Sequence, residues 1–203
     1  MKILLTLLLL TGFCLAEVPL YQQIIAGKQV GPVTATSTHK DIAAIVGTAY
    51  LEEGEVYVGE GQSVPATVIF PGHPNRMLKV IWKSGPRATA HPDSVWIMGS
   101  ESEWSTASGV SLGTKLTQLE RLNGEPFRLL GFEWDLGGAV TEWGGKLESE
   151  LDGIHIRLAL PENAFEVVGE DGFNGLIGDR EIPSTQPGLQ TLNPTIDRIV
   201  VTF

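Results

Sequence analysis

The stretch Ile154-His155-Ile156-Arg157-Leu158 (IHIRL) alternates apolar and polar side chains at every position. Because successive side chains of a β-strand point to opposite faces, this period of two predicts a strand with one buried face. Other short runs are rich in β-branched and aromatic residues and are bounded by glycine and proline, which is typical of strands. The runs lie at residues 55–58, 66–70, 78–82, 95–97, 153–160 and 198–203. The sequence therefore predicts a strand-rich protein.

Three segments have helical patterns. One helix is expected to begin after Thr38, a suitable N-cap, and to end at Gly47. A second is expected to begin after Thr114 and to end at Gly124, with leucines at helical spacing between them. A third segment, residues 161–168, has a less complete helical pattern.

The first two helices suggest an internal repeat. When they are superposed in sequence, Ile42 falls on Leu119, and each helix ends at a glycine and leads into strands. The repeat predicts an α+β, strand-rich fold with two similar helix-plus-antiparallel-sheet halves. We place the first unit at residues 17–105 and the second at 106–203, packed as one body.

The first 16 residues have the three-part design of a signal peptide, in which a charged start, an apolar run and a small terminal residue follow one another. Lys2 is the charge, and Ala16 precedes the expected cleavage site. Cleavage would remove Cys14, the only cysteine of the chain, and with it every thiol and disulfide. A retained N-terminal helix and lipid attachment at Cys14 are the alternatives, although Phe13 does not suit lipid attachment. We expect an exported protein, periplasmic or secreted.

The chain is acidic, with a formal net charge of −10 at pH 7 and no basic cluster. Since phosphate groups are neutralised by lysine and arginine, this composition disfavours nucleic acid and anionic membrane surfaces as partners. No segment after the signal peptide is long and apolar enough to predict a transmembrane helix.

Several strings resemble a group of uncharacterised bacterial exported proteins over most of residues 24–203. In the first half they are GEG (59–61), ATVIFP (66–71) and IWK (81–83); in the second half they are LNGEPF (122–127), GFEWDLGG (131–138), LNP (192–194) and IVV (199–201). This resemblance implies no activity. The helix–glycine–sheet units are also similar, as a fold only, to the tandem modules of the β-lactamase-inhibitor-protein and outer-membrane-assembly lipoprotein folds, and fold does not carry function.

One cluster of acidic and tryptophan residues has the composition of a sugar-binding cleft, because indoles supply stacking platforms and paired carboxylates are the minimum for glycoside hydrolysis. A structural interpretation competes with it: residues 132–145 form two strands with Gly137-Gly138 as the bend, and the indoles are core or cross-strand partners. The candidate ligand-binding residues of this cluster are Glu133, Trp134, Asp135, Glu142 and Trp143.

Other motifs match known catalytic or metal-binding patterns only in part. The string GVSLG at residues 109–113 matches the G-x-S-x-G nucleophile elbow, but no buried strand precedes Ser111, so an ordinary turn is the simpler interpretation. The acidic stretch 170–181 departs from a calcium-binding loop at its first and third positions. A calcium site of another geometry would use Asp171, Asp179 or Glu181. The four histidines form no H-x-x-H or H-E-x-x-H pair.

Together these patterns favour a non-catalytic exported or periplasmic protein that binds a protein or another component of the cell envelope. We expect no catalytic residue, metal or cofactor. Two alternatives are a carbohydrate-binding protein that uses exposed Trp134, Trp143 or Trp104, and an envelope hydrolase whose Ser, His or carboxylate groups share a pocket.

Overall fold

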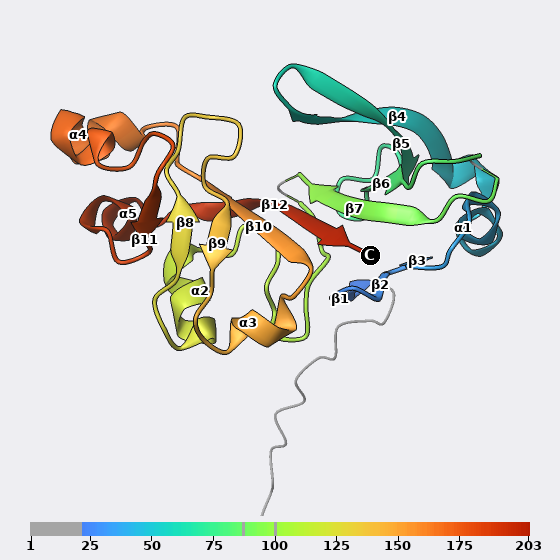
Figure 1. Ribbon diagram of the computed structural model, residues 1–203, viewed down its shortest axis with the longest axis horizontal. Coiled ribbons are helices and arrows are strands. Elements are labelled where there is room, and N and C mark those ends of the chain that lie inside the picture. Colours follow the sequence, from blue (N-terminus) through green and yellow to red (C-terminus); the bar gives the residue numbers. More distant parts are fainter. Residues whose placement is uncertain (1–21, 87, 100) are drawn as a thin grey trace, which may run out of the picture.

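A computed structural model describes residues 22–86, 88–99 and 101–203 (Figure 1). The expected signal peptide, with its cleavage site at Ala16, lies outside the described residues. The predicted α+β class is confirmed, since helices accompany three sheets in which every strand pairing is antiparallel. Within the described ranges, no helix has the length and apolar character needed to cross a membrane.

A six-stranded sheet forms the centre of the protein, with the strand order β10-β12-β7-β6-β5-β4. Each of the six runs singled out by its strand-like sequence belongs to one of these strands. β12 lies between β7 and β10 and so joins residues 51–98 to residues 154–159 in one sheet (Figure 1). The strands are β4 (Leu51–Gly59), β5 (Gln62–Ile69), β6 (Leu78–Trp82), β7 (Pro92–Met98), β10 (Ile154–Ala159) and β12 (Thr195–Thr202).

The two faces of this sheet differ because the side chains alternate. Ile199 on β12 pairs with Ile97 on β7 and with Ile156 on β10, and all three are buried in the core. The next residue along β12, Val200, pairs with Trp96 and His155, which therefore point to the opposite face. The core lies on the first face, and the second is partly open to solvent.

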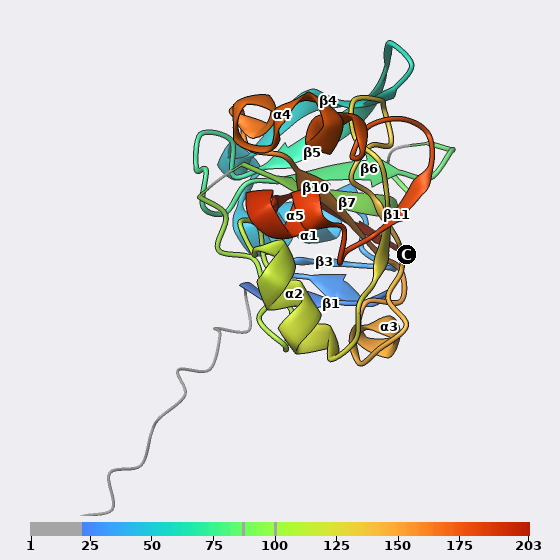
Figure 2. The same ribbon diagram turned by 90° about the vertical axis from the view of Figure 1, so that its left-hand side faces the viewer.

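Two small sheets flank the central one. One is a meander near the N-terminus, and the other lies beside the last two helices (Figures 1 and 2). Their strands are β1 (Ile24–Ile25), β2 (Gln29–Val30) and β3 (Val33–Thr34), and then β8 (Arg128–Leu130), β9 (Val140–Glu142) and β11 (Glu181–Pro183). The helices are α1 (His39–Val46), the 3₁₀ turn η2 (Thr48–Tyr50), α2 (Leu116–Asn123), α3 (Leu147–Glu150), α4 (Ala164–Asn174) and α5 (Pro187–Leu192).

The first helix follows its sequence signals. Thr38 caps α1, and Thr38 and Asp41 form a reciprocal capping box. α2 ends at Gly124 as expected, but its N-cap is Lys115, because the hydroxyl of Thr114 instead accepts a hydrogen bond from the N–H of Ser111 at 3.1 Å.

The third helix is longer than its sequence pattern indicated. α4 runs six residues beyond the predicted end at residue 168 and passes through a kink at Gly169 (φ 69°, ψ 178°). Its second half therefore occupies the first residues of the acidic stretch 170–181. The division into units 17–105 and 106–203 stays a prediction, although both ranges contribute strands to the central sheet.

Candidate functional site

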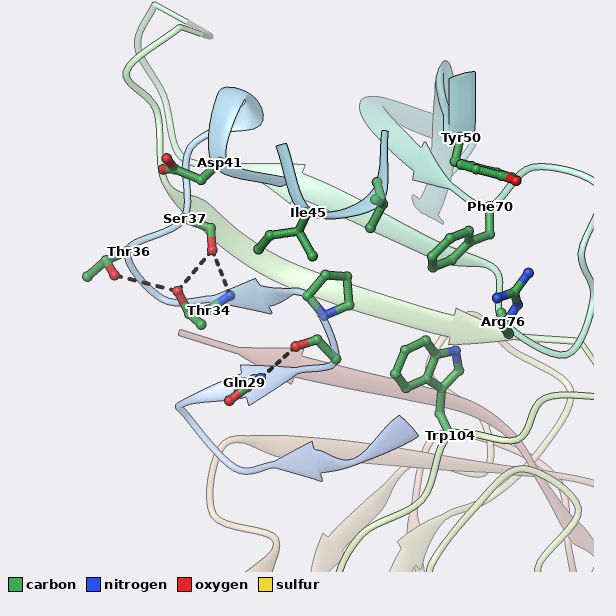
Figure 3. A pocket seen from close by; sticks show the side chains of 13 residues that line it. Gln29, Thr34, Thr36, Ser37, Asp41, Ile45, Tyr50, Phe70, Arg76 and Trp104 are labelled. Atoms are coloured by element: carbon green, nitrogen blue, oxygen red, sulfur yellow. Dashed lines mark hydrogen bonds between the residues drawn. The ribbon is translucent and has the colours of Figure 1, made fainter. Parts of the chain in front are cut away.

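A groove of about 780 Å³ lies between α1 and the N-terminal meander; we call it the α1 groove (Figure 3). Its volume falls in the range of pockets that hold small ligands. It is lined by segments that are distant in sequence, namely the meander, α1, the end of β5 and the loops that carry Arg76 and Trp104. The lining residues are Gln29, Gly31, Pro32, Thr34, Thr36, Ser37, Asp41, Ile45, Val46, Tyr50, Phe70, Arg76 and Trp104.

The capped start of α1 decides which of its side chains reach the groove. The Thr38 hydroxyl accepts the N–H of Asp41, while the Asp41 carboxylate accepts the N–H and hydroxyl of Thr38. The hydrogen bond from the Thr38 hydroxyl has the larger effect and that from the Thr38 N–H the smaller, and both hold the pKa of Asp41 below its ordinary value of 3.8. With the helix fixed in this way, Ile42 is fully buried and Ile45 lines the groove while 65% exposed. Together with Val46 and Pro32, Ile45 gives the groove an apolar lining.

The polar end of the groove is satisfied by its own hydrogen bonds. The Ser37 hydroxyl accepts the N–H of Thr34 at 3.0 Å and lies 2.9 Å from the Thr34 hydroxyl. The side-chain amide of Gln29 donates to the carbonyl of Gly31 at 2.6 Å. Since these groups already have hydrogen-bond partners, a ligand is not needed to satisfy them at this end of the groove.

The opposite end is aromatic and carries a positive charge. The Tyr50 and Phe70 rings lie 5.7 Å apart, and the Arg76 guanidinium lies 4.7 Å above the Phe70 ring. Phe70 adopts a left-handed backbone (φ 56°), which costs a non-glycine residue on the order of 1–3 kcal/mol. The N–H of Phe70 donates to the Tyr50 carbonyl at 2.8 Å and holds this conformation. In this backbone conformation the Phe70 ring lies under Arg76.

Trp104 supplies the unmet polar group of the groove. Its side chain is 1% exposed, and its indole N–H is buried without a hydrogen-bond partner among the described residues. Leaving such a donor unsatisfied costs about 1–3 kcal/mol. Figure 3 shows the indole nitrogen on the side of the ring that faces Phe70 and Arg76. Because this nitrogen is closed to solvent, an acceptor oxygen of a ligand in the groove would meet its N–H only after a neighbouring side chain moved aside.

The predicted acidic and tryptophan cluster is assembled only in part: Trp134 and Asp135 line one pocket, which neither Glu142 nor Trp143 lines. Trp143 is only 8% exposed and packs on Phe127 with the ring centroids 5.0 Å apart, as the structural interpretation expected. Glu142 and Glu133 are exposed, and no hydrogen bond joins either of them to another predicted site residue in the described chain. Trp134 is half-buried and donates its indole N–H to a backbone carbonyl.

The expectation of two strands with a bend at Gly137-Gly138 was wrong for the first strand. β8 ends at Leu130, and a turn occupies residues 133–138 before β9 begins at Val140. Gly138 explains the turn, because it has φ 78° and a Cβ added there would lie 2.0 Å from the carbonyl oxygen of Leu158. The sharp turn carries Asp135 away from Glu142 and toward the β4–β5 hairpin.

The candidates outside that cluster do not share a site with one another. Ser111 lies in a loop with its hydroxyl 3.3 Å from that of Thr114, and the residues lining the adjacent pocket include neither histidine nor carboxylate. Asp171 lies in α4, whereas Glu181 lies in β11 and forms an ion pair with Arg128 at 2.9 Å. Across the described ranges, no three histidine, cysteine or acidic side chains are grouped as a metal site would require.

Trp104 was a candidate from its sequence, whereas the rest of the α1 groove was not predicted. The meander strands have only two residues each, too few to show a period of two. The available signal was the Thr-rich stretch before α1 followed by an apolar helix face, which predicts a cap and not a cavity.

No protein-family model matches the chain, and neither does any curated protein sequence. Among solved structures, the chain is similar to the uncharacterised protein YfeY from Escherichia coli, with a TM-score of 0.46 and 16% sequence identity over 88% of this chain and 99% of that one.

Proposed function

We propose that the protein is exported, is non-catalytic, and binds an amphipathic component of the cell envelope in the α1 groove. The observation that carries the proposal is the buried indole N–H of Trp104, which has no hydrogen-bond partner among the described residues and belongs to a groove that Arg76 also lines. A ligand with an acceptor group would recover the cost of that orphan donor, which the free protein bears.

The lining defines the chemistry of the ligand. Pro32, Ile45 and Val46 offer an apolar wall, whereas Arg76 and Trp104 offer a cation and a donor at one end. An acyl chain that ends in a carboxylate matches both features, because the chain covers the apolar wall and the carboxylate accepts from the donors. A segment of a partner protein with an apolar side chain and an acidic group is the competing occupant.

Laurate is the probe, and lauryl alcohol is its uncharged counterpart. The five tryptophans give five indole N–H signals in a ¹⁵N–¹H correlation spectrum of residues 17–203, and Trp104→Phe identifies that of Trp104. We expect laurate to move this signal downfield, as acceptance of its proton requires. Lauryl alcohol should bind at least about tenfold more weakly, since a hydrogen bond between charged partners contributes on the order of 1.5–3 kcal/mol.

Two matched substitutions localise the site. Ile45→Glu places a charge on the apolar wall from an exposed helical position and should abolish laurate binding. Val167→Glu makes the same kind of change on α4, where the side chain is 47% exposed and outside the groove, and should leave binding unchanged. Equal affinities in the two variants, or an unmoved Trp104 signal at saturation, would refute the proposal.

Export is tested separately by the intact mass of the protein recovered from the envelope fraction. A chain that begins at Glu17 is the expected product. A full-length chain recovered from the cytoplasm would contradict export without bearing on the groove.

A further inference from the structure

The open face of the central sheet holds a second cluster of polar and aromatic side chains. Trp96, Val200 and His155 are cross-strand partners on β7, β12 and β10. In the neighbouring row, Arg198 on β12 pairs with Arg157 on β10. Because cross-strand partners point to the same face, these five side chains border one surface on the side away from the core.

Two loops cover this surface and turn it into a cleft of about 450 Å³, the arginine cleft. One is the tip of the β4–β5 hairpin, and the other is the turn after β8. They are tied together by Asp135, whose carboxylate accepts the backbone N–H of Glu60 at 2.8 Å and the hydroxyl of Tyr57 at 3.5 Å. Trp134 and Leu136, the neighbours of Asp135, line the cleft with Tyr57.

The two arginines of the cleft are in different states. Arg157 forms a two-point ion pair with Asp197 through its Nε and Nη2 atoms. Arg198 has its guanidinium 5.1 Å from the centre of the Trp96 ring, and its Nε is buried with no hydrogen-bond partner in the described part of the chain. Arg198 is therefore a cation whose donors are incompletely used.

Electrostatics leads to the same conclusion. Burial and then repulsion by Arg157 lower the pKa of Arg198, and the attraction of Asp197 opposes them without cancelling them. The carboxylate of Asp135 is occupied by the hairpin and forms no ion pair with Arg198 among the described residues. Asp197 is engaged by Arg157, so Arg198 has no ion pair of its own in the described part of the chain, although the Asp135 carboxylate also lines the cleft.

We propose that the arginine cleft is a second binding site, which takes a carboxylate joined to a flat apolar group. The carboxylate binds the free donors of Arg198. The flat group lies against the apolar lining that Trp134, Leu136 and Tyr57 provide. A small aromatic acid and the C-terminus of a peptide that ends in an aromatic residue share this chemistry.

The test measures binding by calorimetry to residues 17–203. Phenylacetate and a short peptide with a free C-terminal phenylalanine are the probes, and phenylacetamide and the amidated peptide are their uncharged counterparts. We expect the charged form of at least one pair to bind at least about tenfold more tightly than its counterpart. The tighter of the two charged probes identifies the source of the carboxylate.

Substitutions then place the ligand. Arg198→Met keeps the apolar stem, removes the donors and should weaken the preferred probe at least about tenfold. Arg128→Met removes the same charge from the β11-β8-β9 sheet, outside the cleft, and should leave binding unchanged. Binding unaltered by Arg198→Met, or no binding of either charged probe at millimolar concentration, overturns the proposal.

A second pair of variants keeps the test valid if Arg198→Met fails to fold. Leu136 is 55% exposed at the cleft, so Leu136→Glu adds a negative charge there with little cost in folding. It should weaken the charged probe several-fold, whereas the uncharged Leu136→Gln should not. Equal binding in both variants would contradict the proposal. Ile45→Glu, which blocks the α1 groove, should leave this site intact, so the two proposals fail independently.

Discussion

Replacement of Asn123 by alanine should destabilise the protein strongly. Asn123 is fully buried at the end of α2, and its side-chain amide donates to the carbonyls of Glu125 at 2.8 Å and Trp143 at 2.7 Å. Its side-chain oxygen accepts the N–H of Leu147, the first residue of α3, at 3.1 Å. One side chain thus joins α2, α3 and the segment that carries Trp143.

The size of the effect follows from these three partners. Asn123→Ala leaves two carbonyls and one N–H without their hydrogen bonds, and each unsatisfied buried group costs about 1–3 kcal/mol. Allowing for partial access of water at Glu125, we expect a loss of about 3–6 kcal/mol in the free energy of unfolding. A domain of this size has roughly 5–15 kcal/mol in total, so Tm should fall by about 10–20 °C.

Urea unfolding followed by tryptophan fluorescence measures this loss. Asn123→Asp should be as damaging at pH 7, because it places an oxygen against two carbonyl oxygens. Asn75→Ala is the matched control, since the Asn75 side chain forms no hydrogen bond with the described residues, and it should change stability by less than about 0.5 kcal/mol. If Asn123→Ala lowers the free energy of unfolding by less than about 1 kcal/mol, these hydrogen bonds do not hold α2, α3 and the Trp143 segment together.

Three further predictions concern single positions. Gly138→Ala should destabilise the protein by more than about 3 kcal/mol in urea unfolding, because residue 138 has a positive φ and the new Cβ would lie 2.0 Å from the Leu158 carbonyl oxygen. A near-neutral effect would contradict this close approach. The carboxyl of Asp41 should titrate with a pKa below 3.8 by NMR, and a pKa at or above 3.8 would exclude the capping box in solution. Because its pKa is lower in the folded protein, its stabilising effect is present above pH 3.8 and is lost as the pH falls through the pKa of the folded state. Asp135→Ala should speed hydrogen exchange of the Glu60 amide by roughly fivefold, since a net hydrogen bond contributes about 1 kcal/mol, and an unchanged rate would mean that the hairpin tip does not depend on this contact.

The sequence predicted the central sheet better than anything else in the fold. The alternation in residues 154–158 and the runs at 66–70 and 78–82 reflect burial on one face, and burial of that kind is a local, periodic property. The capping box at Thr38 is equally local, because its two partners lie three residues apart. Features of this type can be recognised from one sequence.

The sites were harder to predict because tertiary contacts make them. The burial of Trp143 depends on Phe127, and the arginine cleft depends on Asp135 reaching Glu60 across 75 positions of the chain. No periodicity encodes such contacts. The sequence also does not show whether an indole N–H has a hydrogen-bond partner, so the lack of one for Trp104 among the described residues could not be predicted.

The position of β12 inside the sheet has a consequence for the order of events during folding. The edge of β7 that β12 covers has no partner until residues 195–202 join the sheet. Until then, β7 presents unpaired backbone groups that invite pairing with other chains. Because this pairing joins distant parts of the chain, it is also slow to form. The folding chain therefore passes through a stage in which a chaperone would protect it from aggregation, and the docking of β12 ends that stage.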